Sequence, residues 1–134
     1  MVAMGPYVAV VDDEAPVRTA LGRLLRLADY DVAAFGCGDE FLAAAAARRP
    51  DCVVLDVNMP GLSGFDTQSR LAVVHADLPV VFITASDDPA FEQQARDSGS
   101  ELLRKPFSND VLLEAVGKAL DMLQSTSLWH KGGR

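Results

Sequence analysis

The sequence predicts an α/β fold in which a five-stranded parallel sheet is covered by five helices. Short apolar runs alternate five times with segments of helical character, the pattern of a parallel sheet covered by helices. Charged residues also stand where three of the runs end: Asp12 and Asp13, then Asp56, then Lys105. Because parallel strands end at one edge of their sheet, these four side chains are expected to meet there, where open α/β sheets bind ligands.

The expected strands are short apolar runs bounded by turn residues. The third run is continuously apolar, as in a strand buried on both faces, so we place it at the centre of the sheet. Strands are expected at Tyr7–Val11, Asp31–Phe35, Cys52–Leu55, Pro79–Ile83 and Leu102–Arg104.

One helix is expected after each strand. The first repeats valine and leucine at helical spacing, and the second is rich in alanine, the best helix former. A turn-rich loop, Asn58–Gly64, precedes the third helix, and Ser108 or Asn109 can cap the last. Helices are expected at Ala15–Ala28, Asp39–Arg48, Phe65–Val74, Pro89–Ser98 and from the last cap to about Leu123.

Length and charge limit the classes of function. The 134 residues suit one domain, to which we assign residues 1–123, followed by a frayed tail at residues 124–134. The apolar runs are far shorter than the ~20 residues of a membrane span, and the N-terminus lacks a signal-peptide pattern, so a cytoplasmic protein is expected. A net charge of −7 without a basic stripe argues against direct nucleic-acid binding. Cys37 and Cys52 are expected to be buried apolar residues, neither a disulfide nor metal ligands.

Carboxylates that converge in this way call for a cation. At about 4 Å and an effective dielectric constant of ~20, two ionised carboxylates repel each other by roughly 4 kcal/mol. Lys105 offsets part of this repulsion, and a hard divalent ion with oxygen ligands would offset the rest.

Four motifs in register resemble the receiver domains of two-component response regulators, most of all those of the nitrogen-fixation regulator subgroup. The resemblance covers roughly residues 7–123. It implies a doubly wound, flavodoxin-like sheet with strand order 2-1-3-4-5. The motifs are Val10-Val11-Asp12-Asp13-Glu14, Leu55-Asp56-Val57-Asn58-Met59-Pro60-Gly61, Phe82-Ile83-Thr84-Ala85 and Lys105-Pro106-Phe107.

The resemblance implies a phosphorelay signalling switch that uses Mg²⁺. Asp56 would accept a phosphoryl group from a sensor histidine kinase or a phosphotransfer protein, in an autocatalysed transfer followed by self-dephosphorylation rather than enzymatic turnover. Asp13, Asp56 and the backbone carbonyl of Asn58 would ligate the metal, with Asp12 helping through water.

The resemblance also implies roles for the remaining motif residues. Lys105 would contact a phosphoryl oxygen, and its bond to Pro106 would be cis. Thr84 would bond the phosphoryl group and bias a two-state equilibrium of the fourth helix and fifth strand. A downstream protein target would sense this change, and the domain would be a monomer or dimerise on phosphorylation.

The chain departs from the family pattern at one position. Leu102 stands three residues before Lys105, where the family usually has tyrosine or phenylalanine. We therefore expect phosphorylation to survive and the surface near the fourth helix to respond differently. Asn58 and Ser86 are small and polar, so they leave the acceptor open to water, and hydrolysis within minutes is expected.

Simpler interpretations exist for each motif taken alone. Asp12-Asp13 could cap a helix, Asp56 could open a turn, Lys105 could be a surface lysine and Thr84 could end a strand. Agreement of all four at one edge of one sheet favours a site.

Two other functions use a similar site, and the sequence argues against both. An aspartyl phosphatase of the haloacid-dehalogenase type needs an acid two residues after its nucleophile, where this chain has Asn58. A phosphorylation-independent pseudo-receiver typically lacks the acceptor or a pocket acid, and here both are present. His75 is expected in a solvated loop, and Trp129 is expected to pack or to be exposed without anchoring a partner.

Overall fold

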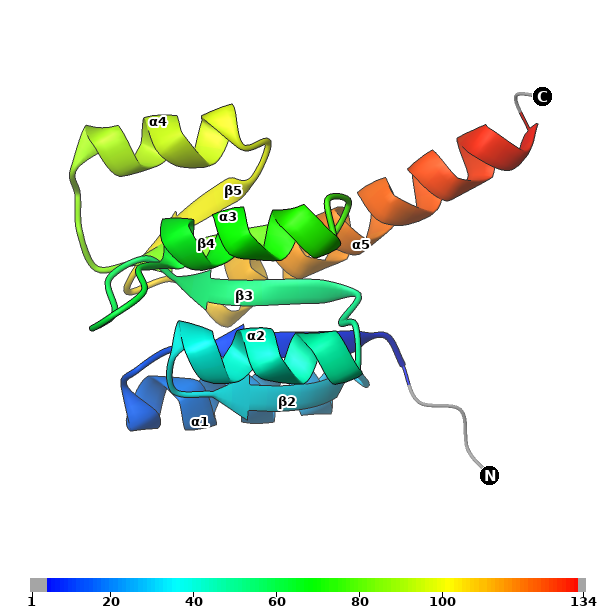
Figure 1. Cartoon of the computed structure of the whole chain (residues 1–134). Coiled ribbons are helices and arrows are strands. Elements are labelled where there is room, and N and C mark those ends of the chain that lie inside the picture. Colours follow the sequence, from blue (N-terminus) through cyan, green and yellow to red (C-terminus); the bar gives the residue numbers. More distant parts are fainter. Residues whose placement is uncertain (1–4, 133–134) are drawn as a thin grey trace.

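A computed structural model describes the backbone of residues 5–132, with side chains as far as Asp121. Five parallel strands form one sheet in the order β2-β1-β3-β4-β5, and five helices alternate with them along the chain (Figure 1). The fold class, the strand order and the central place of β3 are therefore confirmed. The elements are β1 Tyr7–Val11, α1 Ala15–Leu27, β2 Asp31–Phe35, α2 Gly38–Ala47, β3 Cys52–Asp56, α3 Gly64–Val74, β4 Val80–Thr84, α4 Pro89–Asp97, β5 Glu101–Arg104 and α5 Asn109–Gly132.

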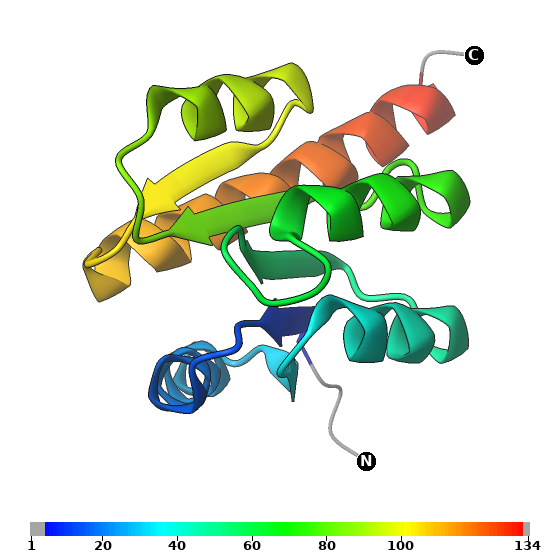
Figure 2. The ribbon, with the colours of Figure 1, turned by 60° about the vertical axis from the view of Figure 1, so that its left-hand side comes forward.

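Helices cover both faces of the sheet. In Figure 1, α2 and α3 lie in front of it and α1 and α5 behind, and Figure 2 shows α4 beside the edge strand β5. Successive side chains of a strand point to opposite faces. In β1, Val8 and Val10 join the core packed against α1 and α5, whereas Ala9 and Val11 join the core packed against α2, α3 and α4. The central strands β1, β3 and β4 are thus buried on both sides, which explains their almost continuously apolar sequences.

The last helix extends beyond its expected end. The helix α5 runs to Gly132, so the expected helix end at about Leu123 was wrong. The physical reason is that residues 124–131 contain no glycine or proline, the residues that most strongly disfavour a helix. At its other end, the Ser108 hydroxyl accepts a hydrogen bond from the Val111 backbone N–H over 3.1 Å, which makes Ser108 the cap. Within residues 5–132, no helix is both long and apolar enough to cross a membrane.

The two cysteines differ in burial. Cys52 lies in β3 and is buried, and this burial raises the pKa of its thiol to about 12. Cys37 is exposed, so its expected burial was wrong. It lies in the connection between β2 and α2 with an extended backbone, outside the sheet that buries Cys52.

Candidate functional site

Three acidic side chains meet at the carboxyl edge of the sheet. One carboxylate oxygen from each of Asp12, Asp13 and Asp56 lies within 4.8 Å of the others. Asp12 and Asp56 are buried, with exposed fractions of 0% and 2%, while Asp13 is exposed. Because Asp12 follows β1 and Asp56 ends β3, the cluster lies where the strand order reverses, the place at which doubly wound sheets bind ligands.

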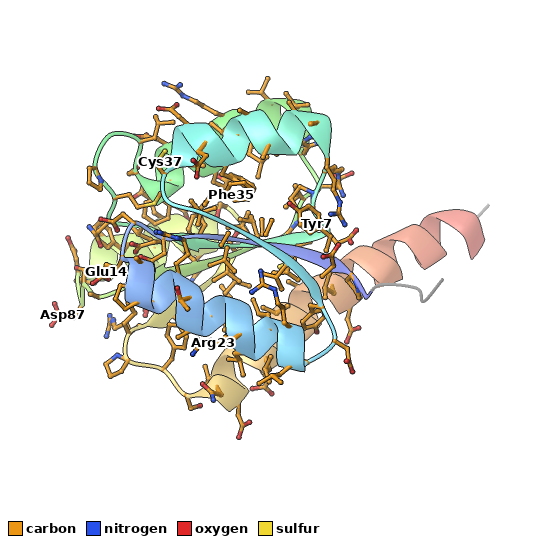
Figure 3. The ribbon with its side chains drawn as sticks, turned by 90° about the horizontal axis from the view of Figure 1, so that it is seen from below. Tyr7, Glu14, Arg23, Phe35, Cys37 and Asp87 are labelled. Atoms are coloured by element: carbon orange, nitrogen blue, oxygen red, sulfur yellow. The ribbon has the colours of Figure 1, made fainter. Side chains whose placement is uncertain are left out.

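The same edge carries the loops that follow β1, β2 and β4. Figure 3 shows it at the left, marked by Glu14, Cys37 and Asp87, while Tyr7, from the start of β1, lies toward the opposite end. Asp56 is therefore the last residue of a buried strand, whereas Asp12 and Asp13 lie in the loop that directly follows β1.

Lys105 bridges the acidic side chains. Its Nζ lies 3.0 Å from Asp12 Oδ2, 3.1 Å from Glu14 Oε1 and 3.8 Å from Asp56 Oδ1. Burial is the largest single effect and lowers the pKa of Lys105, but the hydrogen bonds to Asp12 and Glu14 and the charges of Asp56 and Asp12 together hold the pKa above its usual value. The lysine therefore stays charged and offsets part of the repulsion among the acids.

The Asp56 carboxyl has an unusual acidity. Burial is the main cause that raises its pKa, to about 7, and the charge of Asp12 adds to the rise. The charge of Lys105 and a hydrogen bond from the Asn58 backbone N–H act in the opposite direction, without cancelling it. A second cation in this cluster would favour the ionised carboxylate.

Thr84 contacts Asn58 rather than the acids. Its Oγ1 donates a hydrogen bond to Asn58 Oδ1 over 2.9 Å and accepts one from the Ser86 backbone N–H over 3.1 Å. Thr84 is fully buried at the end of β4, while Asn58 is exposed in the loop after β3. The sequence predicted both residues for this edge, but not the hydrogen bond between them.

Close backbone packing shapes the loop after Asp56. The Gly64 N–H donates to the Val57 carbonyl over 2.9 Å, and a side chain at Gly64 would place its Cβ 2.8 Å from Val57 Cα. Gly61 has a φ of +77°, a conformation that glycine adopts at no steric cost. The two glycines thus let the chain turn directly from β3 into α3.

Lys105 is placed by β5 and by the backbone around it. Its N–H donates to the Thr84 carbonyl over 2.7 Å, which joins the ends of β4 and β5. The bond between Lys105 and Pro106 is cis, as the resemblance implied.

Two residues near the site were missed by the sequence analysis. Glu14 pairs with Lys105, and Arg18 Nη1 donates to the Asp12 carbonyl over 2.6 Å. Their positions in the sequence could have indicated both contacts, because Glu14 directly follows the two acids and Arg18 lies one helical turn later on α1. Asp12 also accepts a hydrogen bond from the Glu14 N–H over 2.9 Å, so it supports the start of α1 while it contacts Lys105.

Leu102 lies in an aromatic neighbourhood. It pairs with Phe82 in the register of β4 and β5 and is partly buried in the core beneath α4. The Phe65 ring lies 4.7 Å from that of Phe82 and 5.9 Å from that of Phe91 on α4, measured between ring centroids. The aromatic partner of Phe91 on α4 is therefore Phe65 on α3, and not a residue of β5.

Two further expectations concerned residues outside the cluster. His75 follows the last residue of α3, in the loop where it was expected, but it is partly buried, so its expected solvation was wrong. Its Nε2 is buried without a hydrogen-bond partner in the described part of the chain, and its backbone carbonyl accepts the Leu78 N–H over 3.2 Å. Trp129 lies outside the residues whose side chains are described.

The fold and the site define a doubly wound α/β protein with an acidic, lysine-bridged cluster at its topological switch point. The sequence model described as the response regulator receiver domain matches residues 8–117, and the chain belongs to this family. It is therefore a receiver domain of two-component signal transduction.

Relatives and solved structures agree with this assignment. Nodulation protein W of Bradyrhizobium diazoefficiens is 38% identical over 85% of this chain and 51% of its own length. Chemotaxis protein CheY4 of Vibrio cholerae is 30% identical, with a TM-score of 0.78 over 88% of this chain and 100% of that one. The DrrB receiver domain activated by BeF3 is 26% identical, with a TM-score of 0.79 over 88% of this chain and 99% of that one. The chain spans about half the length of nodulation protein W and of the transcriptional regulatory protein TdiR of Thauera aromatica.

Proposed function

We propose that this receiver accepts a phosphoryl group on Asp56 from a phosphohistidine of a sensor kinase or phosphotransfer protein. The observation that carries the proposal is the place of Asp56, at the end of the central strand with Lys105 Nζ 3.8 Å from its Oδ1. In the transfer, a carboxylate oxygen forms a bond to phosphorus while the bond from phosphorus to the imidazole nitrogen breaks. The imidazole leaves with the electron pair of that bond.

The acidic cluster suits a hard divalent cation. All of its ligand atoms are carboxylate oxygens, the donors that Mg²⁺ prefers. We propose that Asp13, Asp56 and the Asn58 carbonyl hold Mg²⁺, with Asp12 helping through water. The bound ion would supply charge neutralisation for the phosphoryl oxygens.

Lys105 and Thr84 would contact the phosphoryl group itself. Lys105 has the charge and the position to pair with one phosphoryl oxygen, because its Nζ already lies between Asp12 and Asp56. Thr84 would donate its hydroxyl proton to another oxygen, which requires the hydroxyl to leave Asn58.

The readout of phosphorylation would be a shift in α4 and β5. A change in the contacts of Thr84 favours one of two arrangements of this region, and a protein target or an attached effector domain binds one of them better. Such a switch acts where sensor kinases present their phosphohistidine, in the cytoplasm.

Intact mass after incubation with acetyl phosphate tests the proposal. We expect one added phosphoryl group that requires both Mg²⁺ and Asp56, and none in Asp56→Asn. Asp87→Asn is the matched control, because Asp87 is an exposed acid at the same edge and outside the acidic cluster. An unmodified, folded wild-type protein would overturn the proposal and favour a phosphorylation-independent binding module, and a modified Asp56→Asn protein would place the acceptor elsewhere.

A further inference from the structure

We infer that the Asn58 side chain restrains the switch, because it accepts the one hydroxyl proton that the Thr84 side chain could donate to a phosphoryl group. The inference rests on the proposed function of Asp56 and Thr84. It assigns a positioning role to the Asn58 amide that is separate from the proposed role of its backbone carbonyl.

The geometry at Thr84 leaves its hydroxyl no spare donor. A threonine hydroxyl carries one proton and two lone pairs. The proton is directed to Asn58 Oδ1 at 2.9 Å, and the Ser86 N–H donates to the hydroxyl oxygen at 3.1 Å. A phosphoryl oxygen can only accept hydrogen bonds, so it must compete with Asn58 for this proton.

Lys105 is under no such constraint. An ammonium group has three protons. Two of these protons are directed to Asp12 and Glu14. Asp56 Oδ1 lies 3.8 Å from Nζ, so the third proton is left on the side of Asp56. Of the two groups proposed to bind the phosphoryl oxygens, only Thr84 has to break a hydrogen bond first.

The contacts of Thr84 continue to the start of α4. Ser86 donates its N–H to Thr84, and the Ser86 hydroxyl accepts the N–H of Asp88 over 3.1 Å. Asp88 caps α4 by accepting the N–H of Ala90 over 2.9 Å. If the Thr84 hydroxyl turns away from Asn58, the Ser86 N–H loses its present acceptor, and the loop that begins α4 is released.

The hydrogen bond to Asn58 exists in only one of the two arrangements, so it favours the unphosphorylated one. A hydrogen bond of this kind contributes about 0.5–1.5 kcal/mol net. Its removal should therefore tighten the binding of a phosphoryl mimic by about two- to tenfold.

A double-mutant cycle with beryllofluoride tests the inference, since the similar DrrB receiver was solved in a form activated by BeF3. The dissociation constant is measured with Mg²⁺ for the wild type, Asn58→Ala, Thr84→Val and the double variant. Asn58→Ala keeps the backbone carbonyl, and Thr84→Val removes the hydroxyl while it keeps the shape. Asp87→Asn is the control that should bind like the wild type.

We expect Asn58→Ala to bind about two- to tenfold more tightly than the wild type, and this gain to vanish when Thr84→Val is present. The amide signal of Ser86 in Asn58→Ala should also move, without ligand, toward its position in the beryllofluoride complex. Unchanged or weaker binding by Asn58→Ala would overturn the inference. So would an equal gain in both backgrounds, because Asn58 would then act through access to the acceptor. A wild type that binds no beryllofluoride and takes no phosphoryl group would overturn the proposed function and the inference together.

Discussion

Lys105 Nζ donates a hydrogen bond to Asp12 Oδ2 over 3.0 Å, although 93 residues separate the two along the chain. The pair joins the end of β5 to the end of β1 across the strands between them. Asp12 is fully buried, so its negative charge needs a cation inside the protein. Lys105 supplies that cation.

Removal of this cation should destabilise the metal-free protein. We expect Lys105→Met to lower the free energy of unfolding by about 1–3 kcal/mol in EDTA, because the buried Asp12 loses its charged donor. Added Mg²⁺ should recover more free energy in the variant than in the wild type, since the ion would compensate the same charge. Urea unfolding with and without Mg²⁺ measures both effects. Lys118→Met, on the exposed side of α5, is the control, and an equal loss in both variants would contradict the prediction.

The raised pKa of Asp56 predicts a pH dependence of stability. The folded-state pKa of about 7 lies above the usual 3.8, so the folded protein binds this proton more tightly than the unfolded chain does. The contribution of Asp56 therefore destabilises the metal-free protein increasingly as the pH rises from about 4 to about 7, and levels off above that.

Thermal unfolding of the wild type and Asp56→Asn in EDTA isolates this contribution. Asparagine cannot ionise, so the variant should have the higher Tm, with a gap that is larger at pH 8 than at pH 5. Mg²⁺ should raise the Tm of the wild type more at pH 8 than at pH 5, because the ion and the proton compete for the same carboxylate. A gap of the same size at pH 5 and pH 8 would show that Asp56 ionises normally in the folded state.

Gly64 should resist substitution because of the backbone beside it. In Gly64→Ala the new Cβ would lie 2.8 Å from Val57 Cα, next to the acceptor strand, so we expect a loss of about 1–3 kcal/mol and slower phosphorylation by acetyl phosphate. Gly117→Ala is the matched control, since among the described residues no atom beyond the neighbouring helix backbone lies within 4 Å of its new Cβ, and alanine favours a helix by up to about 1 kcal/mol. Urea unfolding of the two variants should give opposite signs, and a stable Gly64→Ala protein would contradict the predicted clash.

Leu102→Tyr should alter the response without abolishing phosphorylation. Leu102 is partly buried beside Phe82 in the core under α4, and tyrosine would add a ring and a hydroxyl to that contact. We expect phosphorylation on Asp56 to persist, with a changed phosphorylation-dependent shift of the backbone amides in α4 and β5, measured by NMR. If those shifts and partner binding stay as in the wild type, Leu102 has no part in the readout.

The lifetime of the phosphoryl group is predicted to be short. Asn58 is exposed and Ser86 is half-buried, so neither side chain closes the acceptor off from water. We expect hydrolysis in minutes or less, followed by intact mass after removal of acetyl phosphate. A half-life of many hours would mean that the site is more closed to water than these two side chains indicate.

Local patterns predicted most of the fold. The five apolar runs and the helical segments between them give every element to within a few residues except the end of α5, because a strand buried on both faces must be apolar throughout. The convergence of Asp12, Asp56 and Lys105 followed from the same pattern, since parallel strands bring their carboxyl ends to one edge. The strand order came from the resemblance to a family, and residue spacing alone did not contain it.

Other features depend on which atoms meet across the sheet. The sequence alone shows neither that Thr84 donates to Asn58 nor that Glu14 shares Lys105 with Asp12, because these contacts join side chains from different loops. The pKa of Asp56 likewise reflects burial and the distance to neighbouring charges. The sequence by itself therefore determined the family, the elements and the residues at the edge of the sheet. Only the tertiary structure decided how their protons and charges are shared, since hydrogen bonds and Coulomb interactions depend on distances that no local pattern contains.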